Sequence, residues 1–199
     1  MSDLMRQNPG FDVNKDLGSG ETLLHHACSE DSSSAVIPLL LAHPDIDVHL
    51  KNRYGQTPFY LACANGRPSC VREMLKDSRV KVTEPDKYGF TPLWWASRDG
   101  HIDIIKWWIA SGRELDLGTP RDVNYTDAIE VAKERGKTEV VALLERFKKN
   151  LKETRQAVRV GIDWYNSRAA EMFAVTANQR HHDHDPCSQA LLHCRPASS

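Results

Sequence analysis

The C-terminal end of the sequence holds the densest group of side chains able to bind a metal ion. They are His181, His182, Asp183, His184, Asp185, Cys187, His193 and Cys194. Imidazole and thiolate are good zinc ligands, but the spacing matches no standard zinc finger, and residues 178–199 form a polar, proline-containing stretch. A disordered tail with weak metal binding and a transition-metal site both stay open. We favour the disordered tail and predict no cofactor and no metal ligand.

The adjacent pair His25-His26 has the residue type for general acid–base catalysis. Equivalent positions of the repeats described below hold Tyr60, Trp94 and Glu130, so no chemistry recurs along the chain. The sequence also lacks a Gly-rich phosphate loop, a Gly-x-Ser-x-Gly segment and a His-Glu-x-x-His segment. We therefore predict a structural role for these histidines, no enzymatic activity and no small-molecule substrate.

Composition is that of a folded protein with no strong global charge. Hydrophobic residues make up 40% and charged residues 27%, and the formal net charge is -1, so no overall field attracts nucleic acid or an acidic membrane. A helix that crosses a bilayer needs about 18 consecutive apolar residues, and no run in the sequence approaches that length. Residues 1–14 also lack the apolar core of a secretory signal. The five cysteines are odd in number and unevenly spaced, which favours an intracellular location, with the cytoplasm preferred over the nucleus.

A short phrase recurs along the chain and predicts the elements that carry these side chains. It is Gly55-Gln56-Thr57-Pro58 and again Gly89-Phe90-Thr91-Pro92, with weaker copies at 20–23 and 125–128. The anchor residues Thr22, Thr57, Thr91 and Asp127 are 35, 34 and 36 residues apart. Self-similarity at such a period is typical of a repeat array.

One repeat, residues 86–115, predicts a turn, a helix, a second turn and a second helix. Thr91 stands where an N-cap hydroxyl satisfies a free backbone N–H, and Pro92 follows at the first helical position. Gly100 stands where the helix ends. Helices this short need neighbouring repeats to cover their apolar faces.

The second helices repeat their apolar residues at 13, 14, 17 and 18 positions after each anchor. Those positions hold Ala35, Val36, Leu39 and Leu40; Cys70, Val71, Met74 and Leu75; Ile104, Ile105, Trp108 and Ile109; and Val140, Val141, Leu144 and Glu145, of which all but Glu145, in the terminal repeat, are apolar. Pro38 lies among them, so the second helix of the first repeat is expected to begin near Ser34, which places the proline close to its first turn. Asp127 with Glu130 predicts a capping box in the last repeat.

The recurring Gly-x-Thr-Pro phrases, Ala96 to His101 and the paired apolar positions resemble the ankyrin repeat, over about residues 8–148. The resemblance implies an all-α solenoid of stacked helix-turn-helix units joined by short hairpins. We expect a partial N-terminal repeat at 1–15, four repeats at about 16–50, 51–85, 86–120 and 121–148, a helical extension at 149–177 and the tail at 178–199.

The same resemblance implies non-catalytic protein–protein binding, as an adaptor or scaffold, through the concave face. Its contact positions correspond here to Arg53, Tyr54, Gln56, Asn65, Lys87, Tyr88, Phe90, Arg98 and Asp99. Tyr54, Tyr88 and Phe90 are expected to form an aromatic ridge among basic residues, which suits a protein interface. The partner protein itself is not predicted by the sequence.

The two tryptophan pairs at 94–95 and 107–108 have two interpretations. Trp95 and Trp108 fall at core-facing positions, so packing explains them. Trp94 and Trp107 are expected to be less buried, and they either pack between repeats, which we favour, or anchor a partner.

Three further functional alternatives stay open, the first of which is a repeat module that regulates an enzyme or a transcription factor. The chain could bind metal through its tail or nucleic acid through Lys148, Lys149 and Lys152, although a solvated helix face is the interpretation we favour for the lysines. It could also be a truncated paralogue with little function.

The segment after the repeats generates one prediction. Residues 138–160 are expected to form a helix that Gly161 breaks, and residues 163–177 a second helix whose apolar stripe either caps the array or docks a partner; the following test assumes the capping role. Truncation after Asn150 should then lower the melting temperature. An unchanged thermal transition, followed by circular dichroism, would show that the segment has no capping role.

Overall fold

The structure is a computed structural model of the 199-residue chain, and it describes residues 12–118 and 127–163. These two ranges contain helices and turns but no strand. The chain divides into two compact parts after Gln156. The first part holds the repeats. Of the second, only residues 157–163 are described, and they are helical.

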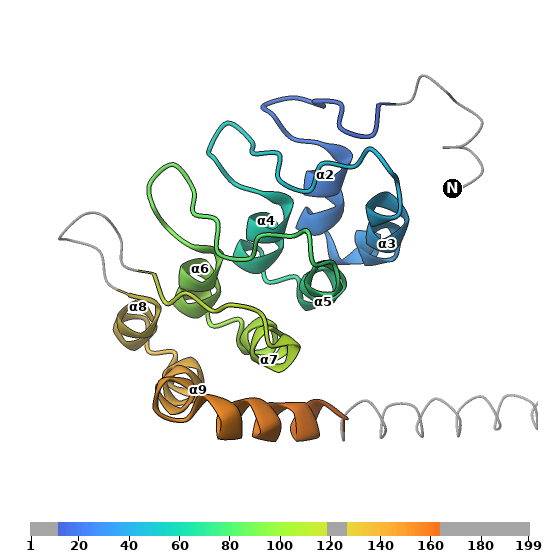
Figure 1. Ribbon diagram of the computed structural model, residues 1–199. Helices are drawn as coiled ribbons and strands as arrows, with labels where there is room; N and C mark the ends of the chain where they lie inside the picture. The colour runs from blue at the N-terminus through green and yellow to red at the C-terminus, as the bar shows by residue number, and fades with distance from the viewer. Residues whose placement is uncertain (1–11, 119–126, 164–199) are drawn as a thin grey trace, which may run out of the picture. The chain divides into compact units, whose positions relative to one another are not determined.

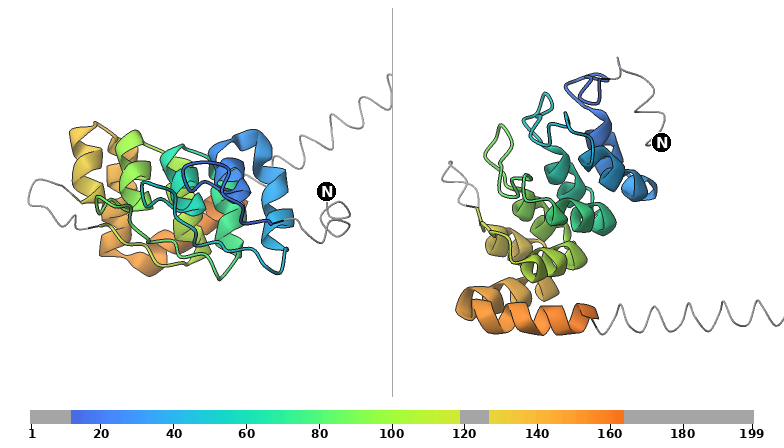
Figure 2. Two further views of the ribbon diagram at one scale, coloured as in Figure 1. Left: turned by 90° about the horizontal axis from the view of Figure 1, so that it is seen from above. Right: turned by 45° about the vertical axis from the view of Figure 1, so that its right-hand side comes forward.

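The helices of the first part form two rows (Figures 1 and 2). One row contains α2 (Leu23–Ser29), α4 (Pro58–Ala64), α6 (Pro92–Asp99) and α8 (Ala128–Glu134). The other contains η1 (Asp31–Val36) with α3 (Ile37–Leu41), then α5 (Pro68–Lys76), α7 (Ile102–Ser111) and α9 (Thr138–Lys149). Each helix contacts its counterpart in the next repeat. The predicted all-α solenoid of stacked helix-turn-helix units is therefore confirmed.

The first helices of repeats two and three begin as predicted. The Thr57 hydroxyl accepts a hydrogen bond from the Tyr60 backbone N–H at 3.2 Å, and Thr91 accepts one from Trp94 at 3.2 Å. A proline occupies the first turn of each helix, where its missing N–H has no partner to lose. Gly100 ends α6 with φ 81°, a left-handed conformation that favours glycine.

Repeat four starts by a different route that gives the same result. The Asp127 carboxylate accepts hydrogen bonds from the backbone N–H groups of Ile129 and Glu130, at 2.8 and 2.9 Å. The Glu130 carboxylate accepts one from the Asp127 N–H at 3.3 Å. The predicted capping box is confirmed, and it replaces the Thr-Pro start of the preceding repeats.

The hydrophobic core lies between the two rows of helices. The first row contributes a small residue from each repeat, which lets adjacent helices approach closely: Ala27, Ala62, Ala96 and Ala132, each at most 6% exposed. Phe59 of repeat two packs edge-on against Trp108 of repeat three, with ring centroids 5.1 Å apart. Cys28, Cys63 and Cys70 are buried and free, as expected of small packing residues. The core is thus shared between neighbouring repeats.

The register predicted for the second helix of repeat one is wrong. Ala35 is exposed and Leu39 is 40% exposed, whereas Ile37 and Leu40 are buried. The cause is Pro38, which lacks an N–H and falls in the first turn of α3. The preceding residues form the 3₁₀ helix η1, and its three residues per turn rotate the side chains relative to an α-helix.

The predicted helix break at Gly161 is also wrong. The helix breaks earlier, at Asn150, whose side chain accepts a hydrogen bond from the Glu153 N–H at 3.2 Å and donates one to the Glu153 carboxylate at 2.6 Å. A new helix covers 151–163 and includes Gly161. Asn150 caps the helix that follows it, and this capping explains why the break occurs at this residue. The stripe predicted for 163–177 lies almost wholly outside the described residues.

Three arginines join the second helices of successive repeats. Each side chain donates to a backbone carbonyl at or near the C-terminal end of the preceding second helix: Arg79 to Leu41 at 2.6 Å, Arg113 to Asp77 at 2.9 Å, and Arg155 to Ile109 at 3.2 Å. The Asp77 and Ile109 carbonyls also accept a backbone N–H bond, from Val80 at 3.2 Å and from Gly112 at 3.3 Å. Each arginine therefore adds a hydrogen bond at or near the end of the second helix of the preceding repeat.

Candidate protein-binding surface

Three hairpins precede the first helices of repeats one to three and lie side by side along one edge of the stack (Figure 1). In repeat two, the side-chain oxygen of Asn52 accepts hydrogen bonds from the N–H groups of Tyr54 and Gln56, at 3.0 and 3.1 Å. Asp16 does the same for Gly18 and Gly20, and Asp86 for Tyr88 and Phe90. One short polar side chain thus fixes the shape of each hairpin tip.

Successive hairpins are tied together through their backbones. The Arg53 N–H donates to the Ser19 carbonyl at 2.8 Å, and the Lys87 N–H donates to the Tyr54 carbonyl at 3.0 Å. Gly55 permits this approach, because a Cβ added there would lie 2.8 Å from Cγ of Lys87 and 2.9 Å from its backbone nitrogen. The three tips therefore form one continuous strip.

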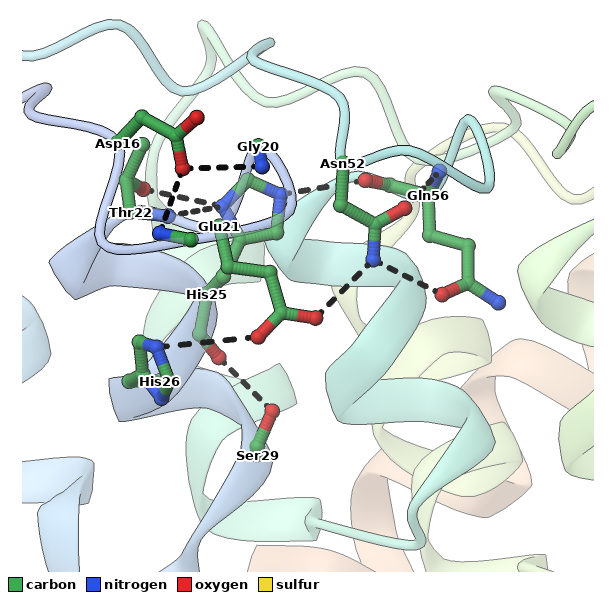
Figure 3. Close-up of polar contacts among 10 residues, drawn as sticks. Asp16, Gly20, Glu21, Thr22, His25, His26, Ser29, Asn52 and Gln56 are labelled. Carbon is green, nitrogen blue, oxygen red and sulfur yellow. Dashed lines mark hydrogen bonds and ion pairs between the residues drawn. The ribbon is translucent and has the colours of Figure 1, made fainter.

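His25 ties the first helix of repeat one to the hairpin of repeat two (Figure 3). Its Nδ1 lies 3.1 Å from the Thr22 N–H, which donates to it, so the proton is assigned to Nε2, 3.2 Å from the Gln56 carbonyl. Burial lowers the pKa of His25 below its ordinary value of 6.5. This contact with the hairpin of the next repeat gives His25 a structural role, as predicted.

Tyr60 takes the corresponding place in repeat two. Its hydroxyl donates to the Asp86 carboxylate at 2.7 Å, so it fastens α4 to the hairpin of repeat three. Burial, followed by the neighbouring carboxylate, raises the pKa of Tyr60 and keeps the phenol protonated. Two different side chains thus meet one requirement, which is to hold the next hairpin tip against the helix.

Four of the nine predicted contact residues come together on the hairpin strip. Tyr54 is 42% exposed and Tyr88 is 67% exposed. The Arg53 guanidinium lies over the Tyr54 ring at 4.7 Å, and Lys87 is exposed beside it. We call these residues, with Leu17, the tip ridge.

The other five predicted residues lie off the tips or are partly used by the fold. Gln56 and Phe90 are half-buried, Gln56 in the network of Figure 3 and Phe90 against Trp94 with ring centroids 4.3 Å apart. Asn65, Arg98 and Asp99 lie at the ends of α4 and α6. The expected aromatic ridge is thus reduced at Phe90, which packs on its own helix.

The exposure of two residues was not predicted from the sequence. Trp95 was expected in the core but is half-buried, with the Arg98 guanidinium 4.6 Å from its ring. A signal existed, because the same position in repeat one holds the polar residue His26. Leu17 is 49% exposed on the first hairpin. It follows Asp16 as Arg53 follows Asn52, so alignment of the hairpins would have found it.

The lysine-rich end of α9 is not a uniformly basic surface. An open pocket between α8 and α9 is lined by Asp127, Ile129, Glu130, Lys133, Glu145, Lys148 and Lys149. Its acidic and basic side chains are equal in number, and Lys133 pairs with Glu145 at 2.7 Å. This balance weighs against the nucleic-acid alternative.

Residues 12–118 and 127–163 contain no group of three or more potential metal ligands. The His/Cys tail at 178–199 lies outside the described residues. No helix in the described ranges has both the length and the hydropathy that a membrane span requires.

A family model described as ankyrin repeats (3 copies) matches residues 2–83 and 24–119, which together exceed half of the chain. The chain belongs to the ankyrin-repeat family. This assignment agrees with the stacked helix pairs and hairpins described above.

Several ankyrin-repeat relatives resemble part of the chain. It is 39% identical over 87 residues to human SMC5-SMC6 complex localization factor protein 1, covering 44% of this chain and 8% of the relative. It is 36% identical over 90 residues to alpha-latrotoxin-Lg1a of Latrodectus geometricus, covering 45% and 6%. The human transient receptor potential cation channel subfamily A member 1 is 29% identical over 96 residues, covering 47% and 8%. The match thus spans less than a tenth of each relative.

The buried histidine generates a pH prediction. Because the pKa of His25 is lowered in the folded state, the unfolded chain binds more protons below pH 6.5, and stability should fall as the pH drops below that value. The expected loss is at most about 1.4 kcal/mol per pH unit. Urea unfolding at about pH 7.5 and about pH 5.5 measures it.

Two variants make this pH test specific. His25→Gln should remove much of the pH dependence while lowering stability by about 1–3 kcal/mol at neutral pH. His26→Gln, at a side chain that is 55% exposed, should leave the dependence in place. An unchanged pH dependence in His25→Gln would contradict the assignment.

The close approach at Gly55 generates a second prediction. Gly55→Ala places a Cβ against Lys87 at φ 80°, whereas Gly136→Ala introduces a comparable backbone strain at φ 65° with no atom within 4 Å. Both should destabilise the protein, Gly55→Ala by about 1–2 kcal/mol more. Urea unfolding measures the free energy of unfolding of both variants. Equal decreases would show that the contact between the hairpins contributes nothing to stability.

Proposed function

We propose that this chain is a non-catalytic adaptor or scaffold that binds a protein partner through the tip ridge. The observation that carries the proposal is a row of large apolar side chains left exposed on adjoining hairpins: Leu17, Tyr54 and Tyr88. These are half of the large hydrophobic residues that are exposed in the described ranges. Exposed apolar clusters among polar residues are typical of interaction sites.

The rigidity of the hairpins supports the same proposal. Backbone hydrogen bonds hold the tips at fixed positions relative to one another, so little side-chain and loop freedom is lost when a partner binds. Tyrosine suits such a surface, since it offers a large contact area with few rotatable bonds. Asn65, Arg98 and Asp99 are proposed to extend the contact along the helix ends, with Gln56 and Phe90 supporting it.

Family and location agree with an adaptor role. Ankyrin repeats generally mediate protein–protein interaction and are typically non-catalytic. One relative carries a name that describes localisation of a complex, and a scaffold is the kind of protein that performs such a task. The free buried thiols of Cys28, Cys63 and Cys70 support a reducing, intracellular location.

The tyrosines provide the direct test. Tyr54→Ala combined with Tyr88→Ala should weaken partner binding by about 1–2 kcal/mol for each ring that acts as an anchor. Because both side chains project from hairpin tips, helical content and melting temperature should be unchanged. Partners identified by proximity labelling in the native cell are then titrated against purified wild-type and variant chains.

A matched control uses exposed apolar residues that are not part of the hairpins in the sequence. Leu151→Ala with Val160→Ala removes side chains that are 46% and 57% exposed and should leave binding unchanged. Loss of circular dichroism signal in the tyrosine variant would instead assign those rings to the fold. Equal losses of binding in both double variants would remove the tip ridge as the interface.

A further inference from the structure

The hairpin tips carry charge of a single sign. The residues that follow the hairpin-fixing side chains are Leu17, Gly18, Ser19 and Gly20 in repeat one, Arg53, Tyr54, Gly55 and Gln56 in repeat two, and Lys87, Tyr88, Gly89 and Phe90 in repeat three. The only charged side chains among them are Arg53 and Lys87. The nearby carboxylates of Asp16 and Asp86 are turned to backbone N–H groups of their own hairpins.

Neither cation is neutralised within the described structure. Arg53 and Lys87 form no ion pair with any residue in the described ranges, whereas Lys51, just before the second tip, pairs with Glu84 at 2.8 Å. The two unpaired groups lie on adjoining tips, because the Lys87 N–H is bonded to the carbonyl of Tyr54. The strip thus presents two unneutralised positive charges beside two exposed rings.

Contacts on the hairpins restrain both side chains. The Arg53 guanidinium lies over the ring of Tyr54 at 4.7 Å, a cation–π contact that restrains its position. The Lys87 stem lies against Gly55, so its position is set by the hairpin before it. A guanidinium group can bind a carboxylate in a bidentate manner.

We propose that the tip ridge recognises an acidic segment of the partner protein. Carboxylates of that segment pair with Arg53 and Lys87, and an apolar side chain between them packs against Tyr54 and Tyr88. This inference rests on the proposed function, and it adds the chemical class of the partner. Complementary charge of this kind steers association and selects among partners.

The same surface fits nucleic acid poorly. Tight binding to a phosphate backbone uses about 6–10 cationic contacts, whereas the tips supply two. The net charge of the chain is -1, so no wider field supplements them. An acidic peptide with an apolar anchor needs fewer charges, because apolar burial contributes the remainder.

The experiment selects random peptides, about twelve residues long and displayed on phage, on the full-length chain. Enriched peptides are synthesised with a fluorescent label and titrated by fluorescence anisotropy. We expect them to be rich in Asp and Glu around an aromatic or aliphatic residue. Their affinity should fall several-fold between about 0.05 M and about 0.5 M salt, because exposed charges are screened.

Charge reversal identifies the residues involved. Arg53→Glu with Lys87→Glu should weaken the acidic peptides by about tenfold or more, and peptides with Lys in place of the acids should recover affinity for this variant. Lys148→Glu with Lys152→Glu changes the net charge equally at exposed residues of α9 and the helix after it. It should leave binding within about twofold of wild type.

The outcomes separate this inference from the proposed function. If binding of the selected peptides requires Tyr54 and Tyr88 but the peptides are not acidic, the proposal of an acidic partner is wrong and the proposed binding role is unaffected. The same conclusion follows if charge reversal at Arg53 and Lys87 does not change their affinity. Failure to enrich any peptide that depends on the two tyrosines counts against both. A single-stranded oligonucleotide that binds more tightly than the peptides, with the same dependence on Arg53 and Lys87, would overturn the choice of a protein segment.

Discussion

The fold depends on apolar contact between neighbouring repeats. Each helix of the first row has seven or eight residues, too few to be stable alone in water. Phe59 reaches Trp108 in the next repeat, and the alanine of each first helix allows the close approach that makes such contacts possible. Stability is therefore a property of adjacent pairs of repeats, and no repeat has a self-contained core.

The hairpin strip is a by-product of the same stacking. Repeats held at a constant spacing bring their hairpins to a constant spacing, where backbone groups bond directly from tip to tip. His25 and Tyr60 then hold the tips of repeats two and three to the helix of the preceding repeat, one through a carbonyl and the other through a carboxylate. The tip residues are thereby freed from any role in the core, which explains why tyrosine, arginine and lysine can occupy them. The side chains of the candidate surface therefore differ from one repeat to the next, whereas the backbone of the hairpins keeps the same arrangement.

Much of the fold could be predicted from the sequence because local rules and repetition agree. Thr57 and Thr91 cap their helices, and the apolar pairs of repeats two and three are buried at the expected offsets. The errors arose where one residue outweighed the pattern. Pro38 converted the start of a helix into a 3₁₀ turn, and Asn150 broke a helix by capping the next one.

The candidate site was predictable in part, for a related reason. Tyr54 and Tyr88 follow the hairpin-fixing residues at the same offset, so their exposure could be inferred. Burial of a ring on a short helix depends on what the neighbouring repeat places against it, and that information is not local. Trp95 was misplaced for this reason. The coupling of Lys87 to Tyr54 arises only when two hairpins lie side by side, and no single segment encodes it.

The arginines that reach back to the preceding helix give the array a direction. The carbonyls of Leu41, at the end of α3, and of Asp77, directly after α5, accept hydrogen bonds from Arg79 and Arg113, which lie later in the chain. As the polypeptide leaves the ribosome, the end of each second helix gains this additional hydrogen bond only when the following segment emerges and supplies the guanidinium. Co-translational assembly would therefore advance stepwise from the N-terminus, each new segment sealing the one already made.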